Sequence, residues 1–221
     1  MEKDLRNSEL FEEQFKWKER RENGRFFLLV GLVFVLLFSV VFAWRQTYGG
    51  VEVDGASMNM TLSDKDKLLM RYVSGGVQPK RGDVIVVDVR GYDEFNGTGT
   101  DFLIKRLIAV EGDSLYCVDG DVFIRYAGAT DYVKLQEDYT YFLGNGLTKQ
   151  DCDFASFDDP YDVGVGEVFF LGDNRNNSLD SRFKEGASRL KSLYKASDVY
   201  GIVPEWAIEY KTVLSKIFFA W

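Results

Sequence analysis

The sequence predicts a mainly β body with a small β insertion subdomain, preceded by one membrane-spanning helix. Three observations support this fold class. The chain has 221 residues, which is enough for one main hydrophobic core. One long stretch near the N-terminus carries no charge. Most of the rest consists of short apolar runs separated by turn residues, as in mainly β proteins.

The uncharged stretch extends from Phe26 to Trp44 and reads FFLLVGLVFVLLFSVVFAW. Its length is about that of a helix that crosses ~30 Å of hydrocarbon. A cleaved secretory signal would have a shorter apolar region and small residues at its own cleavage site. A core helix of a soluble protein is rarely apolar on all sides. We therefore expect a membrane-spanning helix at 26–44.

Basic residues near this helix predict its orientation. Beyond its C-terminal end stands only Arg45, whereas a cluster precedes it: Lys16, Lys18, Arg20, Arg21 and Arg25. Basic residues accumulate on the cytoplasmic side, so we expect residues 1–25 in the cytoplasm and the chain from about Gln46 onward outside it. The outer part has more acidic than basic residues, which disfavours a nucleic-acid partner.

The body should contain six main strands, at 67–73, 83–89, 102–110, 115–118, 122–126 and 168–171. Asp119-Gly120 lies between two of them and predicts a hairpin with a type I′ turn. The acidic segment at about 128–166 is long for a connection, so we expect an insertion subdomain there. Residues 206–221 have apolar side chains at helical spacing and predict an amphipathic helix, which packs on the body or lies at a lipid surface.

The chain contains no histidine. This absence excludes a Ser-His-Asp triad, a Cys-His dyad and the usual His-rich zinc sites. The base of a hydrolase with this composition must be Lys, Asp, Glu or Tyr.

Ser57 is a candidate nucleophile because it lies between small residues, in the run Gly55-Ala56-Ser57, about ten residues beyond the predicted span. Most loop serines are turn or capping residues, so this signal is weak by itself. Met58, Met60 and Leu62 alternate after it and would share one face of an extended segment.

Lys105 is a candidate base within the apolar run 102–110, FLIKRLIAV. On a strand it would project on the same side as Leu103 and Leu107. Burial disfavours the ammonium form, so a desolvated lysine can be a neutral amine near neutral pH. The alternative is that Lys105 or Arg106 extends from the sheet to solvent.

A dense polar loop, GDNRNNSLDSR at 172–182, follows the apolar run 168–171. It lacks the spacing of an EF-hand calcium loop. Asp180 and Arg182 could form an ion pair, and Ser178 could donate a hydrogen bond in support of a site.

Together these motifs resemble the successive sequence boxes of type I signal peptidases, the bacterial leader peptidases. The boxes are SMNMTL at 57–62, KRGDV at 80–84, KRLIAVEGD at 105–113 and the loop at 172–182, in that order after an anchor helix. The resemblance covers roughly residues 26–203. Gly55, two residues before Ser57, matches the Gram-positive-like pattern, in which the chain has a single anchor.

The resemblance implies a serine endopeptidase with a Ser-Lys dyad. Ser57 would be the nucleophile, Lys105 the general base, and the backbone N–H of Ser57 part of the oxyanion hole. Ser178 would orient the lysine amine, while Asp180 and Arg182 would hold their loop. Gly55 supplies no hydroxyl, so the hole would depend on backbone donors. The family usually has proline where Met60 stands, which leaves the shape of that turn open.

The resemblance also implies the domain plan and the substrates. We expect a signal-anchor helix at 26–44, an extracytoplasmic catalytic domain at 46–205 and a terminal helix at 206–221. The substrates would be secretory preproteins cut at Ala-X-Ala-like sites beside the lipid bilayer of the cell membrane. We expect a monomer that uses no cofactor and no metal ion.

Two other functions remain open from sequence. A self-cleaving repressor-type protease shares the dyad, but such proteins are cytoplasmic and lack an anchor. A membrane-tethered β domain with a decayed site would bind envelope partners without cleaving them. Cys117 and Cys152 both lie in the exported part, where they could form a disulfide or remain buried free thiols.

Overall fold

The structure, a computed structural model, describes residues 2–73, 77–92, 95–142, 148–182 and 194–218. The chain divides into two compact units, residues 1–47 and residues 48–221. In the first unit, helix α1 (Glu2–Thr47) is continuous. Its segment Asn23–Thr47 includes the predicted span and is long and apolar enough to cross a membrane. The large apolar side chains of this segment are exposed, as they would be in contact with lipid.

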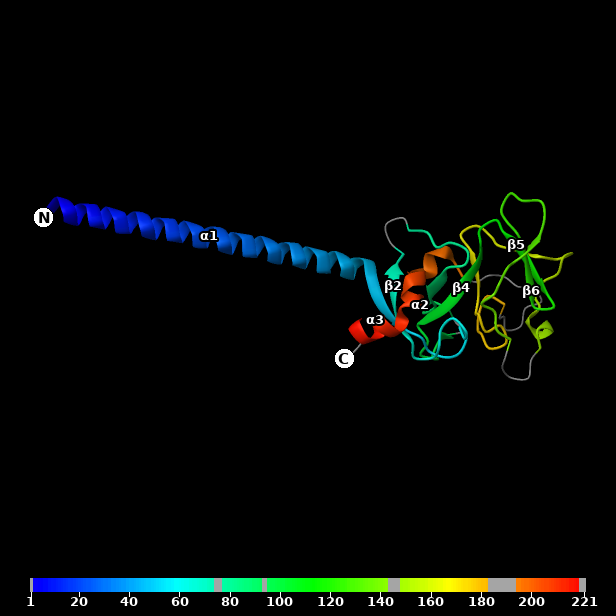
Figure 1. The fold of residues 1–221 in the computed structure, drawn as a ribbon. Coiled ribbons are helices and arrows are strands. Elements are labelled where there is room, and N and C mark those ends of the chain that lie inside the picture. The colour runs from blue at the N-terminus through cyan, green and yellow to red at the C-terminus, as the bar shows by residue number, and fades with distance from the viewer. Residues whose placement is uncertain (1, 74–76, 93–94, 143–147, 183–193, 219–221) are drawn as a thin grey trace. The chain divides into compact units, whose positions relative to one another are not determined.

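The second unit is mainly β, which confirms the predicted fold class (Figure 1). Its larger sheet is antiparallel, in the order β1-β2-β10-β3-β4-β9. These strands are β1 (Tyr48–Glu52), β2 (Lys67–Tyr72), β10 (Val199–Val203), β3 (Val84–Asp88), β4 (Phe102–Val110) and β9 (Val168–Leu171). Sequence patterns had not indicated β1 or β10, because each contains glycine and alternates poorly. Both are held by pairing with β2.

The smaller sheet is also antiparallel, in the order β7-β6-β5-β8. It consists of β5 (Ser114–Val118), β6 (Asp121–Arg125), β7 (Val133–Lys134) and β8 (Tyr161–Asp162). Asp119 and Gly120 both have positive φ, 54° and 75°, as the predicted turn requires. In Figure 1 this hairpin lies on the opposite side of β4 from β2.

The smaller sheet covers a wider segment than the insertion expected at about 128–166. The described residues of that segment, 128–142 and 148–166, form the two short edge strands β7 and β8 and the 3-10 helix Gln150–Cys152. They pair with the β5–β6 hairpin, which precedes them. β7 and β8 lie at opposite edges and do not pair with each other, so the β5–β6 hairpin forms the centre of this sheet.

The larger sheet is buried on both faces, as β3 shows. Val84 and Val86 belong to one core, which also contains Met58 and Leu62. Ile85 and Val87 point into a second core with Leu103, Leu107 and Phe170. A third core joins the smaller sheet to the ends of β4 and β9. This packing leaves the strands little freedom to move and therefore positions the side chains that β4 carries.

The C-terminal segment forms two helices, not the single helix expected over 206–221. α2 (Glu205–Glu209) ends at Tyr210, and α3 (Lys211–Phe218) follows directly. Ala207 is buried, and Leu214 packs on the core that contains Met58. The remaining residues of the prediction, 219–221, lie outside the described part of the chain. A short 3-10 helix, Ala196–Asp198, precedes β10.

Candidate active site

Ser57 lies on a compact turn that follows β1. Gly55 opens the turn with φ of 89°, in the left-handed region where a Cβ atom is disfavoured. Its N–H donates to Asp64 Oδ1 at 2.7 Å. The N–H of Asn59 donates to the carbonyl oxygen of Ala56 at 3.1 Å. These bonds leave Ser57 half-buried at the surface of the body.

Two buried side chains fix this turn to the sheet, since Met58 and Leu62 are each only 1% exposed. Met60 lies between them and points outward, with 73% of its surface exposed. The backbone of Met60 has φ of 74°. A proline ring fixes φ near −65°, so the residue usual in type I signal peptidases is incompatible with the turn observed here.

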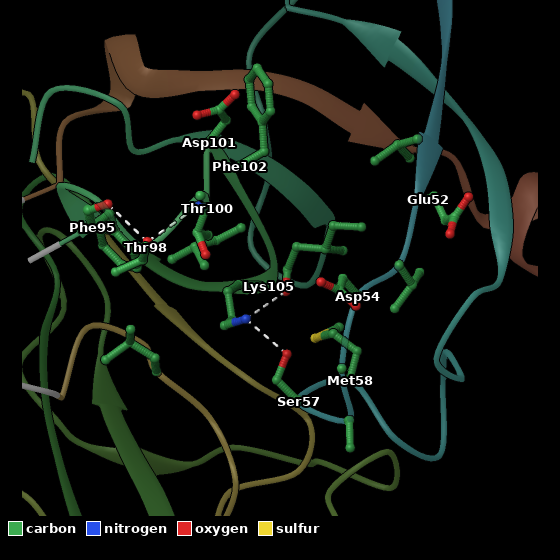
Figure 2. A pocket seen from close by; sticks show the side chains of 18 of the residues that line it. Glu52, Asp54, Ser57, Met58, Phe95, Thr98, Thr100, Asp101, Phe102 and Lys105 are labelled. Atoms are coloured by element: carbon green, nitrogen blue, oxygen red, sulfur yellow. Dashed lines mark hydrogen bonds between the residues drawn. The ribbon is translucent and has the colours of Figure 1, made fainter.

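Lys105 projects from β4 and its amine lies 2.9 Å from Ser57 Oγ. Figure 2 shows the amine pointing at the serine hydroxyl. Nζ also donates to the carbonyl oxygen of Ile104 at 2.9 Å. The side chain is buried, and this desolvation lowers the pKa of Lys105 to about 8, although Asp180 and Asp173 oppose the shift. At pH 7 roughly one tenth of the Lys105 amine is therefore neutral and able to accept a proton.

The polar loop at 172–182 packs directly against the serine turn. A Cβ atom on Gly172 would lie 2.6 Å from the carbonyl oxygen of Ser57, so only glycine permits this approach. Asn174 then makes two bonds to the turn. Its backbone N–H donates to Ser57 O at 2.9 Å, and its Nδ2 donates to Ala56 O at 3.2 Å.

The buried ion pair between Asp180 and Arg182 holds the far end of the loop. Arg182 donates from Nε and Nη2 to the two carboxylate oxygens, each at 2.8 Å, and the N–H of Gly172 donates to Asp180 Oδ2 at 3.0 Å. Burial disfavours the charged Asp180 carboxylate, but Arg182 together with hydrogen bonds from the Gly172 N–H and Ser178 outweighs this effect, and the pKa of Asp180 is lowered. These bonds connect Asp180 and Arg182 to Gly172, the first residue of the loop.

Sequence reasoning missed a second ion pair, between Arg106 and Asp173. Arg106 binds the carboxylate in a bidentate manner, at 2.8 and 2.7 Å, and lies over the ring of Tyr139 at 3.9 Å. The hydroxyl of Thr61 donates to the same carboxylate at 2.5 Å. This cluster links β4, the serine turn and the polar loop. In the sequence, Arg106 directly follows Lys105, and Asp173 belongs to the polar loop at 172–182. Neither the apolar run nor the loop motif indicated that these two residues pair.

The third buried ion pair reaches the loop from the segment before residue 142. Arg175 donates to Glu137, and their side chains are only 2% and 6% exposed. Backbone bonds strengthen this contact, because Tyr141 N–H donates to Asp173 O and Arg175 N–H donates to Tyr141 O, each at 2.8 Å. No periodicity or motif marks Glu137 in the sequence, since its partner is distant along the chain.

A cleft of about 540 Å³ leads to Ser57 and Lys105. The cleft is lined by residues 51–58 and 98–105 and by Phe95, Asn177 and Leu179. Figure 2 shows Glu52 and Asp54 on one side and Phe95 and Thr98 on the other. β4 pairs with β9 only from Arg106 onward, so the edge of its first residues that faces away from β3 pairs with no strand in the described part of the chain.

The structure brings together Ser57 and Lys105 and places Ser178 beside Gly172. Ser178 Oγ is buried and makes no hydrogen bond to Lys105, whereas its hydroxyl lies close enough to Asp180 to help lower the pKa of that carboxyl. Cys117 and Cys152 are both free and buried, and desolvation raises the pKa of Cys117 to about 12. Within the described residues no group of three acidic or cysteine side chains could hold a metal ion.

The family model of signal peptidase, peptidase S26, matches residues 24–212. Signal peptidase I U of Bacillus subtilis is 31% identical over 159 residues, which cover 70% of this chain and 76% of that protein. Signal peptidase I P of Bacillus subtilis subsp. natto is 25% identical and covers 84% and 90%.

A crystal structure of a signal peptidase I from Enterococcus faecalis V583 aligns with a TM-score of 0.41 and 24% identity, covering 58% of this chain and 98% of that one. The family match and the curated relatives confirm the resemblance seen in the sequence motifs. The chain therefore belongs to the signal peptidase family of serine endopeptidases, peptidase S26.

Proposed function

We propose that this enzyme cuts the signal peptide from exported preproteins with a Ser57–Lys105 dyad. The observation that carries the proposal is the buried Lys105 amine 2.9 Å from Ser57 Oγ. In a chain without histidine, a desolvated lysine is a base that can activate a serine near neutral pH.

The first step forms an ester between Ser57 and the signal peptide. Lys105 takes the Ser57 proton as Oγ attacks the scissile carbonyl. The negative oxygen that develops is stabilised by the Ser57 N–H, which donates to no other group in the described part of the chain. The C–N bond then breaks, and the Lys105 ammonium gives its proton to the departing amine of the mature protein.

The second step hydrolyses the ester. Lys105, neutral again, takes a proton from water as the water oxygen attacks the ester carbonyl. The ester bond breaks, Ser57 Oγ recovers a proton from Lys105, and the signal peptide leaves with a free carboxylate.

Ser178 orients the Lys105 amine in this proposal. A neutral amine has one lone pair and two N–H groups. In the structure Nζ donates to Ser57 Oγ and to Ile104 O, and in the neutral form the lone pair would take the place of the N–H that faces Ser57. The remaining N–H needs an acceptor, and the buried Ser178 Oγ has lone pairs that can accept while its O–H faces Asp180.

The preprotein lies extended in the cleft and adds a strand to the open edge of β4, from Phe102 to Ile104. Apolar pockets along the cleft accept small side chains at the first and third positions before the cut, which gives the Ala-X-Ala preference. Anchored by α1 with its N-terminus in the cytoplasm, the enzyme acts as a monomer on the outer side of the cell membrane.

The test uses full-length enzyme in lipid vesicles with a preprotein. Ser57→Ala and Lys105→Met should each abolish cleavage. Matched controls are Ser63→Ala, a nearby loop serine, and Lys67→Met, a half-exposed lysine on β2; both should retain it. Cleavage by a folded Ser57→Ala or Lys105→Met variant would contradict the proposed dyad. If the parent cleaved no preprotein, the proposed function would be wrong.

A further inference from the structure

Asn174 holds two consecutive carbonyl groups of the serine turn. Its Nδ2 donates to Ala56 O at 3.2 Å, and its backbone N–H donates to Ser57 O at 2.9 Å. These oxygens belong to the peptide groups on either side of the Ser57 Cα atom. A single residue therefore restrains both peptide planes that define the backbone conformation of the nucleophile.

Peptide planarity gives this contact a consequence for catalysis. The Ala56 C=O and the Ser57 N–H belong to one planar trans group, so they point in opposite directions. Nδ2 of Asn174 and the N–H of Asn59 both donate hydrogen bonds to Ala56 O and fix its direction. The Ser57 N–H is thereby aimed away from the polar loop.

We propose that Asn174 is a positioning residue of the oxyanion hole, which aims the Ser57 N–H at the oxygen of the scissile carbonyl. This inference rests on the proposed function, in which that N–H stabilises the tetrahedral intermediate. Asn174 itself touches neither the substrate nor the reacting atoms. It acts through the Ala56–Ser57 peptide.

The other end of the amide suggests that stability is not the reason for an asparagine at this position. Asn174 is 3% exposed, and its Oδ1 is buried with no hydrogen-bond partner in the described part of the chain. An orphaned buried acceptor is unfavourable for folding. The benefit of an asparagine here therefore comes from the donor on the same amide, whose acceptor within the described residues is Ala56 O.

Asn174→Ala and Asn174→Leu remove the donor but keep the backbone bond to Ser57 O. Leu also preserves most of the side-chain volume, in case the smaller variant packs poorly. The matched control is Asn176→Ala, which removes another buried amide from the same loop. The Nδ2 of Asn176 donates to Phe142 O at 2.9 Å, away from the serine turn. All variants are measured as full-length protein in lipid vesicles.

For Asn174→Leu we expect kcat to fall about 10- to 100-fold with little change in KM, because losing an oxyanion donor outright costs about 10²- to 10³-fold. The denaturation midpoint should be no lower than that of the parent. Asn176→Ala should retain its kcat. A purely structural role would instead lower the midpoint along with activity in both loop variants.

Two inhibitors separate positioning from binding. A substrate-like peptide ending in an aldehyde adds to Ser57 and places an oxyanion in the hole, whereas the matched peptide alcohol binds without reacting. In Asn174→Leu the aldehyde should lose affinity by the same factor as kcat/KM, while the alcohol keeps its affinity. Equal losses for both inhibitors, or an unchanged kcat, would overturn the inference. Cleavage by Ser57→Ala would overturn the proposed function instead, so the two failures are distinguishable.

Discussion

Replacing Lys105 with methionine should inactivate the enzyme and stabilise its fold at neutral pH. Methionine fills a similar space but has no charge to desolvate. Burial lowers the pKa of Lys105 from 10.5 to about 8, so below pH 8 the folded protein carries an ammonium group that the unfolded chain would hydrate. The shift corresponds to about 3 kcal/mol of unfolding free energy, at 1.36 kcal/mol per pH unit.

The sign and the pH range of this effect follow from linkage. Between pH 8 and pH 10.5 the unfolded chain binds more protons at Lys105 than the folded protein, so the parent gains stability as pH rises. The advantage of Lys105→Met should therefore be about 3 kcal/mol at pH 7 and about 1.5 kcal/mol at pH 9.5. Above pH 10.5 the amine is neutral in both states, and this contribution vanishes.

Denaturant unfolding in detergent, followed by the signals of the aromatic residues in the β body, measures both quantities. Lys67→Met is the control, because it removes a half-exposed lysine and should change the unfolding free energy by less than about 0.5 kcal/mol at either pH. The reasoning is refuted if Lys105→Met is less stable than the parent at pH 7. It is also refuted if the gain is the same at pH 7 and pH 9.5.

Three further outcomes are expected. Cleavage by the parent should rise with pH through an apparent pKa near 8, and a profile flat from pH 6 to 9 would contradict a Lys105 base. Met60→Pro should lower the unfolding free energy by about 1–3 kcal/mol, because φ of 74° is closed to proline, whereas Met60→Gly should not; equal midpoints for the two variants would disprove this account of the turn. Arg175→Met should cost about 3–5 kcal/mol by leaving Glu137 buried and unpaired, and the added Glu137→Leu change should restore most of it; no recovery in the double variant would argue against a buried pair.

Local sequence patterns predicted the anchor helix and the central strands of the body, because apolar length and alternation are local properties. They failed for β1 and β10, whose glycines weaken any strand signal and whose pairing with β2 is a tertiary effect. They also failed at the C-terminus, where one apolar stripe was expected to form one helix. There the chain divides at Tyr210 into α2 and α3, and Leu214 packs on the core.

The candidate site was predictable only as a set of motifs. Ser57 and Lys105 were weak signals individually, and the resemblance to a family is what joined them. The supporting contacts were not accessible, because they depend on which side chains meet in space. Asn174 and Asp173 stood in a quoted motif without a partner, and Glu137 carried no signal at all.

The most direct test of the central claim is to identify the product of one reaction. Full-length enzyme in lipid vesicles is given a preprotein with a single Ala-X-Ala site, and the new N-terminus of the mature protein is determined by mass spectrometry. We expect one cut by the parent, directly after the second alanine, and none by Ser57→Ala. A cut elsewhere, or the same cut by the folded Ser57→Ala variant, would contradict it.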